Sequence, residues 1–211
     1  MSKNINTKLI KLIKYYSLIN HNLIFNDKSI NRYKKNQPNT QKEKAQSLKK
    51  LREDIKDIKN CKLKDSASNL VFSDGNPESK VMIIGEGPGA NEDKEGLPFV
   101  GRAGQLLDKM LNAINLNRKK VYITNVVNYR PPENRKPTDR EVEQYLPYLK
   151  RHIEIIKPKI ILLLGSTAMN AILGNTEVIS KMRGKWHEFE INKLKIYSIV
   201  SFHPAYLLRQ P

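Results

Sequence analysis

The chain has 211 residues, 39% of them apolar, which is enough for one substantial core but leaves two full domains cramped. Its single cysteine, Cys61, excludes an internal disulfide and any metal site built only from thiolates of this chain. The formal net charge of +17 favours a polyanionic partner, with nucleic acid ahead of an anionic membrane surface.

The N-terminal segment is strongly basic, with 12 Lys and Arg against 2 Asp and Glu in residues 1–50. Apolar side chains recur with a helical period over residues 6–25, which predicts a short amphipathic helix. The polar residues 27–42 resemble a linker, and a second helix is predicted at about 42–58. We therefore divide the chain into a basic extension, 1–45, and one domain, 46–211. The extension either binds a polyanion or merely carries a solvated surface, and the sequence favours neither interpretation.

The most apolar stretch of the extension, residues 9–25, is interrupted by Lys11, Lys14 and several polar residues. No apolar run approaches the roughly 20 residues that span a bilayer, and no signal cleavage site follows this stretch. We expect a cytoplasmic protein that acts as a monomer and has no membrane partner.

From residue 80 onward, strand and helix patterns alternate. Such alternation predicts an α/β fold in which a parallel sheet is covered on both faces, with the ligand site at the carboxyl ends of the strands. Strands are predicted at 81–84, 121–127, 160–164 and 195–200, and helices at about 103–115, 138–156 and 166–173. Glu86 follows the first strand, Asn125 lies at the end of the second and His203 follows the fourth, so we expect these side chains to meet at one edge.

The segment 81–104 has the sequence VMIIGEGPGANEDKEGLPFVGRAG, in which an apolar run stops at a glycine-rich turn that carries Glu86. Glycines allow backbone amides to approach a ligand closely, and Phe99 offers a flat ring for stacking. Each residue also has an ordinary structural interpretation: Glu86 and Asn125 as turn residues, Phe99 in the core and His203 in a rigid loop. Those interpretations lose weight because all four residues are predicted at one sheet edge.

The same four residues suit the recognition and release of a nucleobase. An Asn amide donates and accepts hydrogen bonds, so it can recognise a base edge that carries both kinds of group. His203 can donate to an oxygen that becomes anionic as a glycosidic bond breaks. Glu86, or a water that it holds, can favour a positive sugar and aim the nucleophile.

Residues 58–211 resemble the family 4 uracil-DNA glycosylases. The resemblance rests on ordered blocks: VFSDGNP (71–77), GEGPGANED (85–93), LPFVGRAGQLLDKML (97–111), YITNVVNYRPPENR (122–135), RGKWHE (183–188) and HPAYLLRQP (203–211). It implies a three-layer sandwich with a four-stranded parallel sheet. It also implies a monofunctional enzyme of base excision repair that flips uracil out of DNA and hydrolyses its glycosidic bond, leaving an abasic site.

The resemblance further implies roles for individual residues. Asn125 reads the uracil edge, His203 donates to the carbonyl that gains charge and Glu86 supports the cationic sugar, so these three are the predicted catalytic residues. Phe99 is the stacking ring, and Glu92 matches an acid of the pocket. The implied uracil-binding set is Gly85, Glu86, Gly87, Glu92, Phe99, Asn125 and His203.

The resemblance also implies a DNA-contacting loop at residues 203–209. Within it, Leu207 would fill the vacated base stack and Arg209 would lie near phosphates. Arg135 and Arg183 are further candidates for phosphate contacts, although each can instead brace its own loop.

Two features depart from the family. Its members usually bind an iron-sulfur cluster through four cysteines, and the matching positions here are Ile58, Cys61, Tyr129 and Tyr145. Because such a cluster needs about four thiolates, we predict no cluster and no other cofactor, with these side chains packed as a plug. The sequence also ends at Pro211, where members usually continue into a helix, and we expect this to weaken the loop or the fold.

Two other functions remain open at this point. A non-catalytic protein of the same fold that binds uracil or damaged DNA would be indicated by a broken pocket, yet Glu86, Phe99, Asn125 and His203 are all present. A phosphate-binding nucleotide protein would have Lys-Ser or Lys-Thr after the glycine turn, whereas Asn91, Glu92 and Asp93 stand there. His152 and His187 are predicted to have only packing or surface roles.

Overall fold

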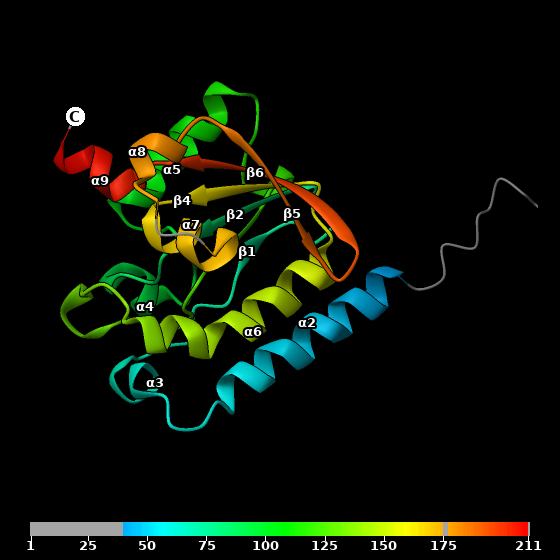
Figure 1. Cartoon of the computed structure of the whole chain (residues 1–211). Coiled ribbons are helices and arrows are strands. Elements are labelled where there is room, and N and C mark those ends of the chain that lie inside the picture. Colours follow the sequence, from blue (N-terminus) through cyan, green and yellow to red (C-terminus); the bar gives the residue numbers. More distant parts are fainter. Residues whose placement is uncertain (1–39, 175–176, 211) are drawn as a thin grey trace, which may run out of the picture. The chain divides into compact units, whose positions relative to one another are not determined.

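A computed structural model describes residues 40–174 and 177–210 (Figure 1). Its centre is a six-stranded sheet of order β1-β3-β2-β4-β6-β5. The four inner strands run parallel, and the two edge strands are antiparallel to their neighbours. The strands are β1 (Asp74–Gly75), β2 (Val81–Gly85), β3 (Tyr122–Asn125), β4 (Ile160–Leu164), β5 (Trp186–Ile191) and β6 (Leu194–Ser201).

The four parallel strands are the ones predicted from sequence, and the edge strands β1 and β5 were not predicted. The last three residues of the RGKWHE segment begin β5, so His187 lies on a strand. The predicted extension, apart from residues 40–45, lies outside the described residues.

The long helices agree with the predicted ones, whereas the short helices were missed. The helices are α2 (Thr40–Lys56), α3 (Lys62–Ser66), α4 (Ala90–Glu95), α5 (Arg102–Ala113), α6 (Asp139–Ile156), α7 (Ser166–Leu173), α8 (Ile179–Met182) and α9 (Pro204–Arg209), with 3-10 turns η1 (Arg118–Lys120) and η2 (Pro132–Asn134). No helix in the described ranges is long and apolar enough to cross a membrane.

The start of α6 illustrates how local sequence sets a boundary. The Thr138 side chain accepts a hydrogen bond from the backbone N–H of Glu141, and the Glu141 carboxylate accepts one from the N–H of Thr138. This capping box satisfies two backbone donors that would otherwise have no partner within the helix.

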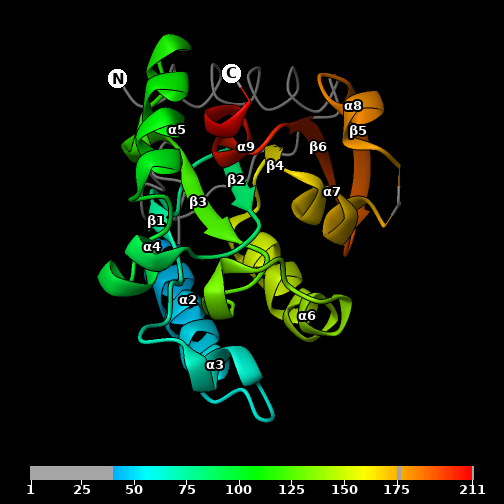
Figure 2. The same ribbon diagram turned by 90° about the vertical axis from the view of Figure 1, so that its left-hand side faces the viewer.

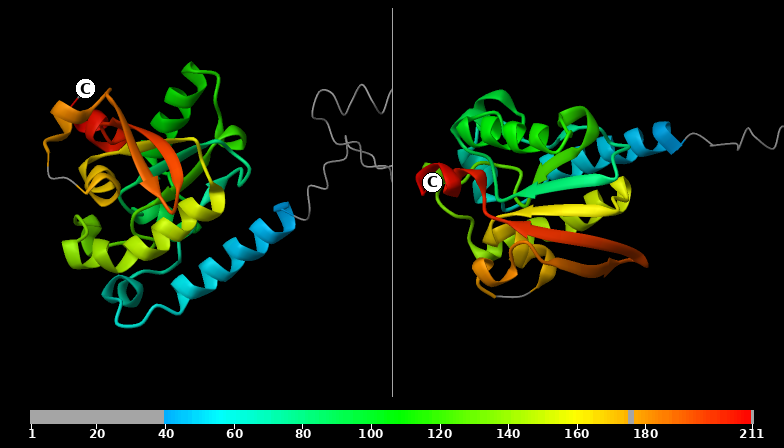
Figure 3. Two further views of the ribbon diagram at one scale, coloured as in Figure 1. Left: turned by 45° about the vertical axis from the view of Figure 1, so that its right-hand side comes forward. Right: turned by 90° about the horizontal axis from the view of Figure 1, so that it is seen from above.

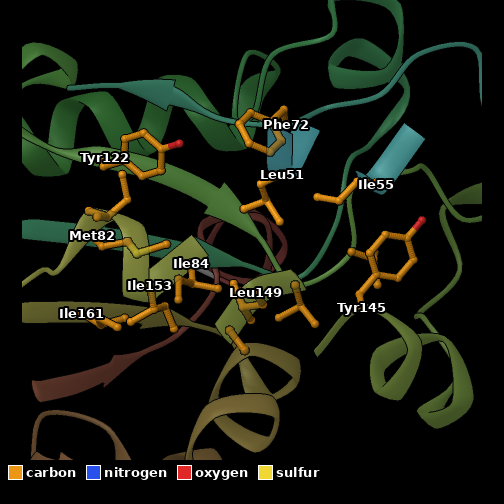
Figure 4. Packing of buried hydrophobic residues seen from close by; sticks show 14 of the residues in the cluster. Leu51, Ile55, Phe72, Met82, Ile84, Tyr122, Tyr145, Leu149, Ile153 and Ile161 are labelled. Atoms are coloured by element: carbon orange, nitrogen blue, oxygen red, sulfur yellow. The ribbon is translucent and has the colours of Figure 1, made fainter. Parts of the chain in front are cut away.

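The sheet has a hydrophobic core on each face, so the fold is a three-layer sandwich. Alternate residues of β2 point to opposite faces, with Met82 and Ile84 in one core and Ile83 in the other. Helices α2 and α6 cover the first face and α5 covers the second (Figure 3). In the larger core, Leu51 and Ile55 of α2 lie together with Tyr145, Leu149 and Ile153 of α6 (Figure 4).

His152 on α6 has the packing role predicted for it. Its ring is 2% exposed and is stacked on Phe72 with ring centroids 4.6 Å apart. Its Nε2 atom lies 2.7 Å from the hydroxyl of Tyr122 on β3. Burial lowers the pKa of His152 to about 3, so the ring is neutral in the folded protein at ordinary pH.

Candidate active site

A cavity of about 630 Å³ lies at the carboxyl ends of the parallel strands, the edge that faces the viewer in Figure 2. Glu86, Phe99, Asn125 and His203 all line it, together with Gly87 and Glu92. The structure therefore brings together side chains that are up to 117 positions apart in the sequence (203 − 86). This convergence is the arrangement expected at the strand ends of a parallel sheet.

Gly85 is not among the residues that line the cavity, so its contact with uracil stays a prediction. A Cβ atom at this position would lie 2.5 Å from Asn125 Oδ1 and 2.5 Å from the ring of Phe99. The absence of a side chain here therefore lets both groups approach the end of β2.

Asn125, the last residue of β3, is 3% exposed. Its Oδ1 atom is buried and accepts no hydrogen bond from any group in the described part of the chain. Burying an unpaired amide oxygen costs about 1–3 kcal/mol. Because Asn125 borders the cavity, this acceptor is placed to receive a hydrogen bond from a ligand.

Phe99 both lines the cavity and belongs to the core on the α5 face. Its backbone is left-handed, with φ of 56°, a conformation that is costly for a residue with a side chain. The Arg118 guanidinium stabilises this turn by donating to the carbonyl oxygens of Pro98 and Phe99. Ion pairs with Asp74 and Asp108, at 2.7 and 2.9 Å, hold the guanidinium in place.

Glu86 is half-buried at the cavity wall and has a defined orientation. The hydroxyl of Thr167, near the start of α7, donates to Glu86 Oε2 at 2.5 Å. Thr167 itself is 4% exposed. A buried donor fixes one carboxylate oxygen and leaves the other for a ligand or a water.

His203 is a neutral hydrogen-bond donor in this site. Its Nδ1 atom accepts the backbone N–H of Ala205 at 3.2 Å, so the ring proton resides on Nε2. Burial holds the pKa of His203 below its ordinary value. The negative charges of Glu86 and Glu92 raise this pKa, and the positive charge of Arg209 lowers it. The ring is stacked with Phe99, with centroids 5.5 Å apart.

Glu92 joins the two loops of the site. Its carboxylate accepts the backbone N–H groups of Gly89, Val100 and Gly101 at 2.8–3.1 Å. Glu92 thus ties the glycine-rich turn to the loop that carries Phe99, while still lining the cavity.

The predicted DNA-contacting residues occupy different settings. Residues 204–209 form helix α9 instead of a loop, because Pro204 occupies its first position and the His203 side chain caps it. Arg209 and Arg135 line the cavity, although Arg135 is bonded through both terminal nitrogens to Glu141. Leu207, which is half-buried, and the exposed Arg183 lie outside the cavity.

The four positions that match cysteines in the family form a packed plug. Ile58, Cys61, Tyr129 and Tyr145 are all buried in the larger core, and Cys61 Sγ lies 3.2 Å from the Tyr145 hydroxyl. The packing prediction is therefore confirmed. One sulfur does not fit the donor set of an iron-sulfur cluster. Within residues 40–174 and 177–210, no three His, Cys, Asp or Glu side chains gather as metal ligands.

Sequence reasoning missed Thr167, Arg118, Phe202 and Tyr206. Thr167 closely follows the end of β4, so the same strand-end rule would have found it. Arg118 carries no local signal, because Lys119 and Lys120 follow it and its acidic partners, Asp108 and Asp74, are 10 and 44 positions away in the sequence. Phe202 and Tyr206 flank His203 and line the cavity with it.

Comparison with known proteins gives consistent matches. The family model for the uracil DNA glycosylase superfamily matches residues 72–211. A type-4 uracil-DNA glycosylase of Sulfurisphaera tokodaii is 44% identical over 170 residues, which cover 78% of this chain and 77% of that protein. Type-4 enzymes of Pyrobaculum aerophilum and Archaeoglobus fulgidus are 42% and 41% identical, over 78% and 79% of this chain and 86% and 85% of theirs. The chain therefore belongs to the uracil-DNA glycosylase superfamily and groups with its type-4 members.

Proposed function

We propose that this protein is a DNA repair enzyme that excises uracil from DNA. It hydrolyses the N-glycosidic bond of an extruded deoxyuridine and leaves an abasic site, which begins base excision repair. The type-4 relatives, named as uracil-DNA glycosylases, support this substrate class.

The observation that carries the proposal is the buried acceptor Asn125 Oδ1, which has no donor within the described ranges. Uracil offers an N–H donor between two carbonyl acceptors. An Asn side chain at the cavity wall matches that edge with its own acceptor and donor. Binding uracil would give this oxygen a donor, which no residue in the described ranges supplies.

In this mechanism, His203 holds the base as it leaves. The neutral ring donates through Nε2 to a uracil carbonyl oxygen that gains negative charge as the glycosidic bond breaks. A neutral imidazole suits this role because it keeps its Nε2 proton. The hydrogen bond from Nε2 to the uracil oxygen strengthens as that oxygen gains negative charge. Phe99 supports the ring of the base.

Glu86 acts on the sugar. Its carboxylate stabilises the positive charge that develops on the sugar and orients the water that attacks it. No lysine nucleophile takes part, since water completes the reaction, and no step passes through a cofactor.

The proposal is tested by single-turnover excision from a uracil-containing oligonucleotide. We expect His203→Ala and Asn125→Ala to slow excision roughly a hundred- to a thousand-fold, the range seen when a donor to a developing oxyanion is removed. DNA affinity should change far less, because neither side chain supplies the charge that attracts phosphates.

Asn112→Ala is the matched control, since Asn112 is an exposed residue of α5 outside the cavity. It should excise uracil at the wild-type rate. If both site variants kept that rate, the assigned roles would be wrong. A wild-type protein that bound uracil-containing DNA without cutting it would support the non-catalytic alternative.

A further inference from the structure

Three side chains pack against one another beside the cavity, and we call this surface the aromatic ledge: Arg183, Phe202 and Tyr206. The ring centroids of Phe202 and Tyr206 lie 5.0 Å apart, with their planes inclined by 36°. The guanidinium carbon of Arg183 lies 4.5 Å from the centroid of the Phe202 ring. The residue after β6, helix α9 and the residue after α8 therefore contribute to one packed group.

The ledge is continuous with the cavity that holds Asn125 and Glu86. Phe202 and Tyr206 line that cavity, and they flank His203 in the sequence. The cavity volume of about 630 Å³ falls in the range for ligands of drug size, so one pyrimidine base leaves much of it unfilled. The unfilled space can therefore accommodate a group adjacent to that base.

Tyr206 presents an exposed aromatic ring whose polar group is already satisfied. The residue is 39% exposed, and its hydroxyl donates to Gln210 Oε1 at 2.8 Å, which fixes the ring from one end. Arg183 and Arg209, both exposed, place positive charge at the same surface. Aromatic rings next to cations are the arrangement on which proteins stack the bases of single-stranded nucleic acid.

We propose that the aromatic ledge binds the unpaired nucleobase adjacent to the extruded uracil, with Tyr206 stacking on that base. The inference rests on the proposed function, because uracil in the cavity is what places the neighbouring base at the ledge. A base inside an intact duplex is paired and stacked on both sides. The ledge therefore favours uracil in single-stranded DNA, or in a duplex opened beside the lesion.

The test is a double-mutant cycle in which one change is Tyr206→Leu in the protein and the other is removal of the neighbouring base from the oligonucleotide. The substrates are single-stranded oligonucleotides that contain one uracil. The nucleotide next to the uracil either carries its normal base or is replaced by a base-less tetrahydrofuran nucleotide, on the 5′ or the 3′ side of the uracil. Both affinity for the oligonucleotide and the single-turnover excision rate are measured. Tyr206→Phe keeps the ring, and Tyr197→Leu removes a tyrosine of β6 that is 44% exposed and lies outside the cavity.

We expect Tyr206→Leu to weaken binding of the normal oligonucleotide about ten- to a hundred-fold, the effect of losing one base–aromatic stack. Removing the neighbouring base on one side should weaken wild-type binding similarly, and the two changes together should cost little more than either alone. Tyr206→Phe and Tyr197→Leu should bind as the wild type does. The excision rate at saturating DNA should be retained in Tyr197→Leu, since Tyr197 does not line the cavity.

Additive losses would overturn the proposal, since Tyr206 would then act independently of the neighbouring base. An unchanged affinity in Tyr206→Leu would overturn it as well. If the wild-type protein failed to excise uracil, only the proposed function would be contradicted. The double-mutant cycle uses binding affinities, which can be measured without excision.

Discussion

Thr167 is the residue whose position most directly affects the proposed chemistry without touching the substrate. Its buried hydroxyl donates to Glu86, so it orients the carboxylate that would face the sugar. A hydrogen bond to a charged group contributes about 1.5–3 kcal/mol. The hydrogen bond from Thr167 aligns the Glu86 carboxylate, so Thr167 is a positioning residue.

We expect Thr167→Val to slow single-turnover excision roughly ten- to a hundred-fold, since the Glu86 carboxylate loses its only described side-chain donor. Thr167→Ser keeps the hydroxyl and should restore most of the rate. The concentration of DNA at half-saturation should be the same in all three proteins. A Ser variant as slow as the Val variant would show that packing, and not the hydrogen bond, is what matters.

At the scale of elements, the plug joins α6 to the segment between α2 and α3. Tyr145 on α6 is fully buried, and its hydroxyl contacts Cys61 just before α3. Burial raises the pKa of the Tyr145 hydroxyl, so it remains protonated and can donate. Aromatic packing thus joins elements at the positions where a metal cluster is expected from the family.

Tyr145→Ala should lower the free energy of unfolding by about 3–5 kcal/mol, because it leaves a large cavity between these elements. Tyr145→Phe keeps the ring and should cost only about 0.5–1.5 kcal/mol through the lost contact with Cys61. Urea unfolding measures both values. Since Tyr145 lies outside the substrate cavity, the Phe variant should excise uracil normally, and a slow Phe variant would contradict this separation of roles.

The whole molecule is predicted to lose stability in mild acid through His152. The unfolded ring binds a proton near pH 6.5, whereas burial lowers the folded pKa to about 3. The unfolded state therefore binds more protons between these values, so the contribution is complete above pH 6.5 and is lost as the pH falls toward 3. The slope is up to about 1.4 kcal/mol per pH unit.

Replacing His152 by Gln removes this titration. Between pH 6 and 4.5, the free energy of unfolding of His152→Gln should fall with acid less steeply than that of the wild type, by up to about 1.4 kcal/mol per pH unit. His203, whose pKa is also lowered, keeps part of the slope in both proteins. Equal slopes in urea unfolding would show that His152 is not the group responsible.

The elements that the sequence predicted are those with a strong local signal. Strands β2 and β4 lie inside the sheet with both faces covered, so each is a continuous apolar run in the sequence. The predicted bounds of these two strands were therefore nearly correct. Helix α9 was missed because HPAYLLRQP is short and was assigned as a loop from the resemblance. Strand β5 was missed because its exposed residues, among them Trp186, are stabilised mainly by pairing with β6.

The sequence by itself determined the order of the parallel strands and the long helices, and with it the edge at which Glu86, Asn125 and His203 meet. Those features follow from the hydrophobic period and from the general geometry of parallel sheets. Only the tertiary structure decided which partners the side chains have: Thr167 donates to Glu86, and Arg118 donates to the turn at Phe99. It also decided that Tyr206 lines the cavity. These contacts join segments distant in sequence, and no local pattern encodes which of them come within hydrogen-bonding distance.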